Sequence, residues 1–270
     1  MEKRVSKEEI VTMHMEQQLE RKKALLVKLG LQEGKSVDEI VKASEGIITK
    51  EDCQRYGTEN RVSSLFDDFP KQMNLPNIFR GENACYPTGK STYYRDGLVQ
   101  RKETSRKEQI RQMIAECSTQ TAPVIPGIAE AHYGISSEWI GFTSNFDEAL
   151  FYACCTVDEQ SGKWRPLDKN DFVASDSSGG ADHHYGVIYM ADAADDRLWE
   201  EAEYNRMIPS GSQPLMRNVM QYAYAMRLGS EDDLVRDERF VRLIFEHSEE
   251  LCRDIYERME QGKYLFRKDQ

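Results

Sequence analysis

The chain has 270 residues, of which 39% are hydrophobic and 31% are charged. This composition favours a globular protein of one large domain, or of one domain with an appendage, and excludes a disordered chain. Lysine and arginine total 36 against 47 acidic residues, which gives a formal net charge of −11. Because proteins that bind a phosphate backbone usually carry a basic excess, the charge argues against duplex nucleic acid as a partner.

The N-terminus and the cysteines predict a cytoplasmic protein. The first residues are charged rather than apolar, and no stretch approaches the roughly 18 apolar residues of a membrane helix. The six cysteines form no C-x-x-C pair, and the adjacent Cys154 and Cys155 favour packing over a disulfide framework or a zinc site. We therefore expect no membrane association and no bound metal.

Capping signals predict helices in the first 75 residues. Ser6 and Glu9 have the spacing of a capping box, and the helix that they open is expected to end at Gly30. Two further helices are expected to open near residues 36 and 49. No strand-like alternation interrupts them, so residues 1–75 are predicted to be a helical region packed on the main domain. A separate partner-docking module is the alternative.

From residue 76 onward the pattern becomes mixed. Strands are predicted at 77–81, 140–144, 186–190, 220–228 and 240–245, and helices at 105–117, at 145–153 and at the closing segment 248–262. Asn145 and Ser248 are predicted to cap the last two of these helices. The polar, glycine-rich segment 157–185 is predicted to be a mobile surface insertion. Because strands and helices alternate without a regular βαβ rhythm, we expect an α+β fold with a mixed sheet over 76–247, followed by a closing helical segment, 248–270.

Four clusters carry chemistry that could form a site. Arginine grips phosphate in two-point geometry, an adjacent glycine lets a ligand approach the backbone, and hydroxyls at a helix N-terminus lie where negative charge is favoured. Taken singly, each cluster has a plain structural explanation, such as an ion pair, a packed histidine, a helix cap or sheet aromatics. The clusters are Phe79-Arg80-Gly81, His132-Tyr133-Gly134, Thr143-Ser144 before a helix, and Arg217 with Gln221, Tyr222 and Tyr224.

The order of these motifs resembles the FRG domain family of bacteria and phages. That family carries an F-R-G motif, then H-Y-G, then a threonine strand with an A-L-x-F-A helix, and late an R-x-x-x-Q element. This sequence matches each element in order over residues 77–229. It departs from the family at 136–141, where the usual arginine and aspartate are missing, and at Ala223, where the family has glycine.

The same order is similar to the R-S-E pattern of ADP-ribosyltransferases, and the resemblance implies an ART-like split sheet and NAD as the substrate. Arg80 would then hold an NAD phosphate or ribose, Thr143 and Ser144 would brace the nicotinamide end, and Gln221 would face the nicotinamide ribose. Gln221 stands where those enzymes often have a glutamate. Glu203 and Glu246 are candidates for the missing carboxylate.

The resemblance therefore implies a transferase or NAD glycohydrolase, in a toxin or phage-defence setting, with Arg80, Ser144 and Gln221 as catalytic residues. The residues expected to contact NAD are Phe79, Gly81, His132, Tyr133, Thr143, Arg217 and Tyr222. Two alternatives stay open. One is a non-catalytic FRG module that binds a nucleotide-like small molecule or a protein partner, and the other is a scaffold in which the N-terminal helices carry the function.

Overall fold

The computed structural model describes residues 1–16, 77–95, 112, 127–128, 136–158, 161–173, 180–200, 202–209 and 223–262. The chain divides into two compact units, one made of Met1–Lys7 with Asn77–Gln270 and the other of Glu8–Pro76. Of the second unit the structure describes residues 8–16, which are helical. The helices predicted within 17–75 lie outside the described residues, and so does the helix predicted at 105–117 apart from residue 112.

The first unit is an α+β domain around one mixed sheet, as the sequence predicts. Among the described residues this sheet has seven strands in the order β1-β9-β6-β2-β3-β8-β7. β1 runs parallel to β9, and the other neighbouring pairs are antiparallel. The strands are β1 (Glu2–Arg4), β2 (Asn77–Glu82), β3 (Trp139–Thr143), β6 (Tyr185–Asp192), β7 (Met207–Pro209), β8 (Ala223–Arg227) and β9 (Val241–Glu246).

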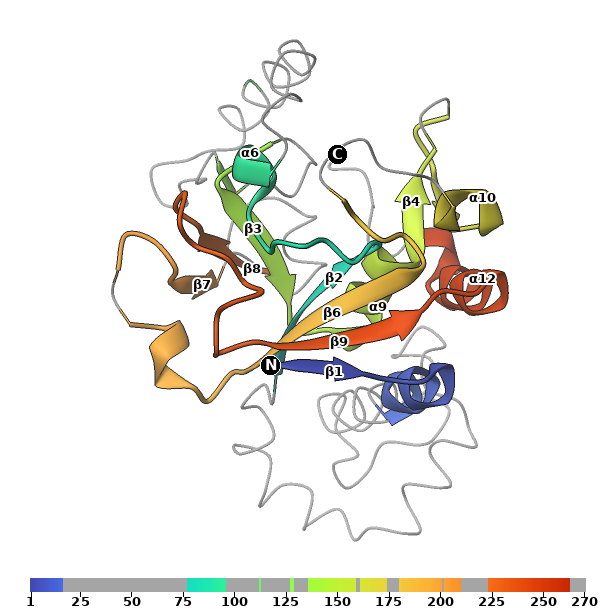
Figure 1. Ribbon diagram of the computed structural model, residues 1–270, viewed down its shortest axis with the longest axis horizontal. Coiled ribbons are helices and arrows are strands. Elements are labelled where there is room, and N and C mark those ends of the chain that lie inside the picture. The colour runs from blue at the N-terminus through green and yellow to red at the C-terminus, as the bar shows by residue number, and fades with distance from the viewer. Residues whose placement is uncertain are drawn as a thin grey trace, which may run out of the picture. The chain divides into compact units, whose positions relative to one another are not determined.

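The sheet is joined at its middle by a single residue pair. β2 pairs with β6 along its whole length, and β3 pairs with β8 in the same way. Between β2 and β3, however, the pairing is limited to Phe79 and Thr143. The two strands therefore diverge from this point, as Figure 1 shows, and divide the sheet into a β1-β9-β6-β2 group and a β3-β8-β7 group.

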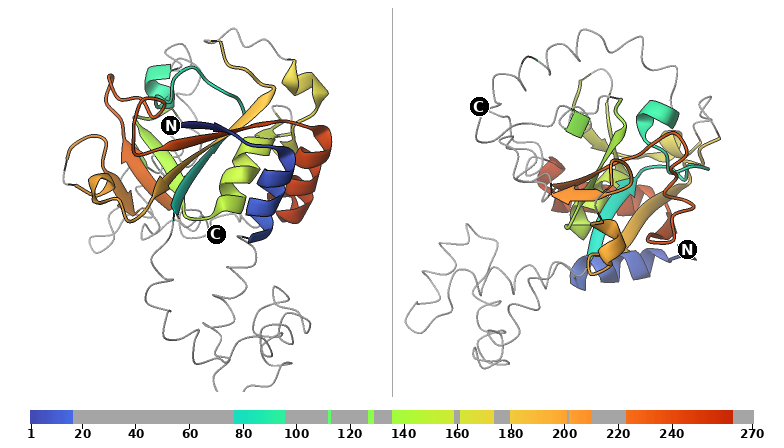
Figure 2. Two further views of the ribbon diagram at one scale, coloured as in Figure 1. Left: turned by 60° about the horizontal axis from the view of Figure 1, so that its bottom comes forward. Right: turned by 90° about the vertical axis from the view of Figure 1, so that its left-hand side faces the viewer.

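In the described part of this unit, two helices lie on one face of the sheet. α9 (Phe146–Cys154) contacts β2, β6 and β3, and α12 (Glu249–Arg258) packs beside it (Figure 2). Asn145 caps α9 and Ser248 caps α12, each through a side-chain oxygen that accepts a backbone N–H. Both caps were predicted from the sequence.

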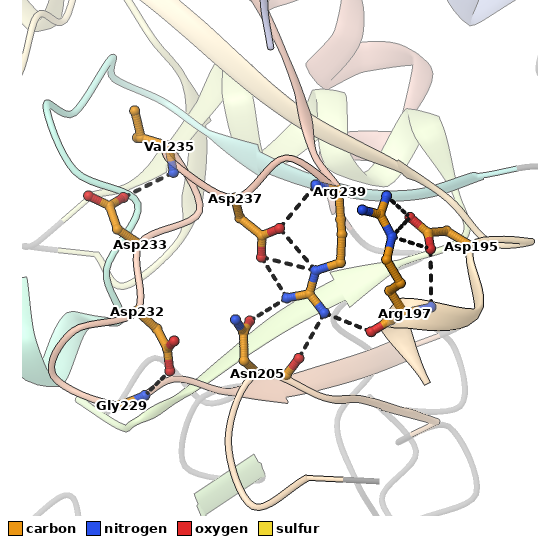
Figure 3. A network of polar contacts seen from close by, with 9 residues as sticks. All are labelled: Asp195, Arg197, Asn205, Gly229, Asp232, Asp233, Val235, Asp237 and Arg239. Carbon is orange, nitrogen blue, oxygen red and sulfur yellow. Dashed lines mark hydrogen bonds and ion pairs between the residues drawn. The ribbon is translucent and has the colours of Figure 1, made fainter. Parts of the chain in front are cut away.

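The opposite face of the sheet carries an apolar core. Side chains from β2, β3, β6 and β9 pack there with residues of the segment that precedes β9, including the buried Leu234 and Phe240. Arg239 fixes this segment through a bidentate contact with Asp237 and bonds to the carbonyls of Arg197 and Asn205 (Figure 3). The core on this face is thus closed by a loop that an arginine holds in place.

Two sequence predictions differ from the structure. Residues 2–4 form β1 rather than helix, because Arg4 pairs with Ile244 and Met1 donates its amino group to the carbonyl of Phe240. Residues 1–7 therefore belong to the sheet domain and not to a helical region.

The segment 157–185 is more than a surface insertion. Within it, β5 (Trp164–Pro166) pairs with β4 (Cys155–Val157), and α10 (Lys169–Phe172) follows. The Trp164 ring packs on Phe151 and Tyr152, which ties β5 to α9. No helix in the described part of the chain has the length and apolar character needed to cross a membrane.

Candidate functional site

Arg80 lies on β2 where this strand separates from β3. Its Nη1 atom donates to the carbonyl of Gly141 on β3 at 3.0 Å, across the part of the interface where the strands no longer pair. Its side chain is 20% exposed, so the guanidinium is held by the protein and still accessible to solvent. This combination is what an arginine needs in order to bind an outside anion in a fixed geometry.

Glu82 lies two residues beyond Arg80 and therefore on the same face of β2. Its Oε1 atom accepts from Nε of Arg80 at 3.3 Å and from Nη2 at 3.1 Å. The same oxygen accepts from Nη1 of Arg95 at 3.3 Å. The side chain of Glu82 is only 5% exposed, and its Oε2 atom has no hydrogen-bond partner among the described residues.

Tyr189 and Arg242 complete this group from the neighbouring strands. Tyr189 on β6 stands opposite Arg80, and Arg242 on β9 stands opposite Tyr189, so the three form a row across the sheet. The hydroxyl of Tyr189 is buried without a partner among the described residues. Burial and then the charge of Glu82 raise its pKa, while Arg80, Arg95 and Arg242 act in the opposite direction. We call Arg80, Glu82, Arg95, Tyr189 and Arg242 the arginine cluster.

The short helix α6 (Thr92–Arg95) connects the cluster to the far side of the split. Arg95 reaches Glu82 on β2, and it also stacks over the ring of Tyr86 at 3.9 Å. Tyr94 donates its hydroxyl to Glu138, next to the start of β3, and the bond raises the pKa of Tyr94 to about 12. α6 therefore holds both strands near the wide end of their divergence.

Glu138 is fixed in turn by Arg227 on β8, whose Nη2 atom lies 2.7 Å from a Glu138 oxygen. The hydrogen bond from Arg227 lowers the pKa of this carboxyl. Glu138 therefore stays ionised and serves as the anchor for Tyr94. The contacts of α6 thus couple the arginine cluster to the β3-β8 half of the sheet.

Three residues of the predicted site lie on the face of the sheet that α9 covers, opposite the arginine cluster: Phe79, Gly81 and Thr143. Phe79 is buried against Phe146 of α9. Gly81 also faces this helix, since a Cβ added to it would lie 1.7 Å from the carbonyl oxygen of Ala149. The missing side chain therefore leaves room for α9 and not for a ligand. The expectation that Gly81 lets a ligand approach the backbone is wrong.

Thr143 has a structural role on the same covered face. Its hydroxyl donates to Glu148 at 3.0 Å and accepts from the backbone N–H of Asn145, and the side chain is 4% exposed. It thereby fixes the first turn of α9. The structure does not bring Thr143 together with the guanidinium of Arg80, because successive strand residues alternate between the two faces.

Ser144 follows Thr143 directly and is half-buried. It lies just beyond the single β2–β3 pair, whereas Gly141, the partner of Arg80, lies before that pair on the same strand. Arg80 and Ser144 are thus on neighbouring segments near the closed end of the split. The other predicted site residues lie outside the described residues, and these are His132, Tyr133, Arg217, Gln221 and Tyr222.

Comparisons with protein-family models, with curated proteins and with solved structures found no match. The likeness to the FRG domain family and to ADP-ribosyltransferases therefore remains a prediction from the order of the motifs.

The structure also places the two acids considered as replacements for a catalytic glutamate. Glu203 is 71% exposed and contacts Arg227 at 3.3 Å, and Glu246 is exposed at the end of β9. Neither contacts the arginine cluster in the described part of the chain. The acid that pairs with Arg80 and Arg95 is Glu82, which the sequence analysis did not single out.

A sequence signal for Glu82 and Arg242 did exist. Arg242 is a charged residue inside a strand that is otherwise mostly apolar, and such a residue needs a buried partner. For Glu82 the signal is its two-residue spacing from Arg80, which places both side chains on one face of β2. What the sequence lacked was the order of the strands, which decides that β2, β6 and β9 are neighbours.

Within the described residues, no three His, Cys, Asp or Glu side chains are grouped so that they could hold a metal ion.

Proposed function

We propose that this protein binds NAD with its phosphates at the arginine cluster and transfers or hydrolyses the ADP-ribosyl group. The observation that carries the proposal is the position of Arg80. Its guanidinium is anchored on Gly141, remains partly exposed, and has a second arginine, Arg95, beside it. Paired guanidinium groups held in place are well suited to two-point contacts with phosphate oxygens.

The proposed reaction breaks the bond between the nicotinamide nitrogen and C1′ of the ribose. Water or an acceptor group forms the new bond to C1′ and gives up a proton, and nicotinamide leaves with the bonding electron pair. Because the transition state resembles an oxocarbenium ion, positioning and charge stabilisation contribute more than a strong nucleophile. Arg80 would supply positioning in this scheme, with Ser144 and Gln221 toward the nicotinamide end. A toxin or phage-defence effector would use such an activity.

The second candidate is a non-catalytic module that binds a nucleotide-like ligand or a protein partner. The position of Thr143 favours it, since this hydroxyl is buried in the α9 cap and cannot brace a nicotinamide bound beside Arg80. The neutral Gln221, in place of a glutamate, favours it as well.

NAD consumption by the purified protein separates the two candidates. We expect turnover that disappears in Arg80→Ala and persists in Arg197→Ala, whose arginine is 59% exposed and pairs with Asp195 outside the cluster. Because Arg80→Ala leaves Glu82 without a main partner, Arg80→Lys serves as the second variant, which keeps the charge and loses the planar fork.

If the wild-type protein consumes no NAD, calorimetry with NAD and ADP-ribose follows. Binding that depends on Arg80 would then support the non-catalytic module. Absence of both turnover and binding would refute the enzyme and the nucleotide-binding form of the second candidate, and would leave the form that binds a protein partner.

A further inference from the structure

The ion pairs of the arginine cluster are longer than the bidentate Arg165–Asp171 ion pair of the same domain. Arg165 binds Asp171 through two separate oxygens at 2.6 and 2.7 Å. In the cluster, by contrast, Arg80 and Arg95 share a single oxygen of Glu82 at 3.1–3.3 Å. Charge-assisted bonds are usually about 2.7–2.9 Å long, so Glu82 satisfies its arginines poorly.

The carboxylate itself is also poorly satisfied. Its Oε2 atom is buried without a partner among the described residues, although a buried carboxylate oxygen normally accepts at least one hydrogen bond. A buried charge with half of its acceptors unused gains little from its present position. Glu82 is therefore a weak counter-ion for Arg80 and Arg95.

Tyr189 offers Glu82 a second position. Arg80 stands opposite Tyr189 in the register, and Glu82 stands opposite Val187, so Tyr189 and Glu82 are diagonal neighbours on one face. Long side chains in such a diagonal arrangement can reach each other. The hydroxyl of Tyr189 is buried without a partner among the described residues, and the charge of Glu82 contributes to the raised pKa of this phenol.

We propose that Glu82 is a built-in counter-ion that a pyrophosphate-bearing ligand displaces from Arg80 and Arg95, and that Tyr189 then receives the carboxylate. In the empty site Glu82 holds the two guanidinium groups. In the occupied site the phosphate oxygens take the arginines, and Glu82 turns to accept the O–H of Tyr189. The affinity of the site is thereby lowered by an internal competitor. This inference rests on the proposed binding of phosphate groups at the cluster.

The test measures the binding of ADP-ribose and of inorganic pyrophosphate by calorimetry. Glu82→Gln removes the competing charge and retains the shape, so we expect both probes to bind about five- to tenfold more tightly. Glu203→Gln is the matched control, because Glu203 also pairs with an arginine but lies outside the cluster, and we expect no change.

Tyr189→Phe tests the second position of Glu82. This substitution removes a buried hydroxyl without a described partner, so the fold should be retained. We expect weaker binding of both probes in the wild-type background and a much smaller effect in the Glu82→Gln background. Equal effects in the two backgrounds would overturn the role given to Tyr189.

The outcomes for Glu82 are separable from those for the proposed function. Unchanged or weaker binding of the probes to Glu82→Gln would overturn the inference. It would also be overturned if neither ADP-ribose nor pyrophosphate binds to the wild-type protein or to Glu82→Gln. NAD turnover that depends on Arg80 would still stand in that case. Conversely, tighter pyrophosphate binding in Glu82→Gln without NAD turnover would support the counter-ion and refute the enzyme.

Discussion

Arg80 and Gly141 lie on adjacent strands that have already separated, and the side chain of one bonds to the backbone of the other at 3.0 Å. The carbonyl of Gly141 would otherwise lack a β2 partner at this point. Arg80 therefore has a structural task at the split as well as an accessible charge. Loss of the whole side chain and loss of its planar fork are different perturbations, which is why Arg80→Lys accompanies Arg80→Ala in the test of function.

Gly81→Ala is expected to destabilise the domain by at least about 2 kcal/mol, because the added methyl would overlap the carbonyl of Ala149 and push α9 away from β2. Urea unfolding measures the change. Gly229→Ala is the control, since its nearest neighbour is a carboxylate oxygen of Asp232 at 3.3 Å that can move. Equal stability of the two variants would contradict close packing of α9 on Gly81.

Much of the fold could be predicted from the sequence, because buried strands and helix caps are marked by residues that lie close together in the chain. The buried strand around residues 186–190 and the caps at Asn145 and Ser248 appear in the structure where the patterns indicate them. β1 was missed because three charged or polar residues, Glu2–Arg4, carry no alternating apolar pattern. This strand forms through pairing with β9, at the other end of the chain.

The candidate site was harder to predict, because it depends on which face of the sheet each side chain occupies. The sequence grouped Phe79, Arg80, Gly81 and Thr143, but alternation along β2 sends Arg80 to one face and its two neighbours to the other. The partners of Arg80 are distant in sequence or lie outside the motif. Tyr189 and Arg242 join it through strand order, and Glu82 joins it through the two-residue period.

Arg239→Lys is expected to destabilise the domain by about 2–3 kcal/mol, because lysine cannot reproduce the bidentate contact with Asp237 and leaves that carboxylate poorly paired. Asn205 would also lose a donor to its side-chain oxygen. Arg197→Lys provides the control, as this arginine is 59% exposed. Thermal unfolding of both variants tests the prediction, and similar losses in the two would refute a special role for Arg239.

Trp164→Ala is expected to cost about 2 kcal/mol of unfolding free energy, because the ring packs on Phe151 and Tyr152 of α9. Val157→Ala, at a position 43% exposed on the paired strand, should cost much less. Chemical unfolding followed by far-ultraviolet circular dichroism gives both values. A negligible loss in Trp164→Ala would restore the view that segment 157–185 is a loosely attached surface insertion.

His247 makes the stability of the domain depend on pH. Its ring is buried between two carbonyl oxygens, with Nδ1 2.9 Å from that of His183 and Nε2 2.8 Å from that of Ala153. Burial disfavours the imidazolium and lowers the pKa of His247, while the two carbonyls favour the imidazolium and act against this effect. Burial is the larger influence, so the folded protein holds the neutral ring and binds protons less readily than the unfolded chain.

The sign of the pH dependence follows from this difference. The contribution of neutral His247 to the stability of the folded domain is fully present above the ordinary histidine pKa of about 6.5. It is lost as the pH falls below this value, toward the lower pKa that His247 has in the folded protein. We expect urea unfolding at mildly acidic pH to show a loss of stability that His247→Gln reduces and that His184→Gln, at a 59% exposed side chain, does not. If instead the wild-type protein gains stability on acidification and His247→Gln abolishes the gain, the two carbonyl bonds outweigh burial and His247 is protonated in the folded state.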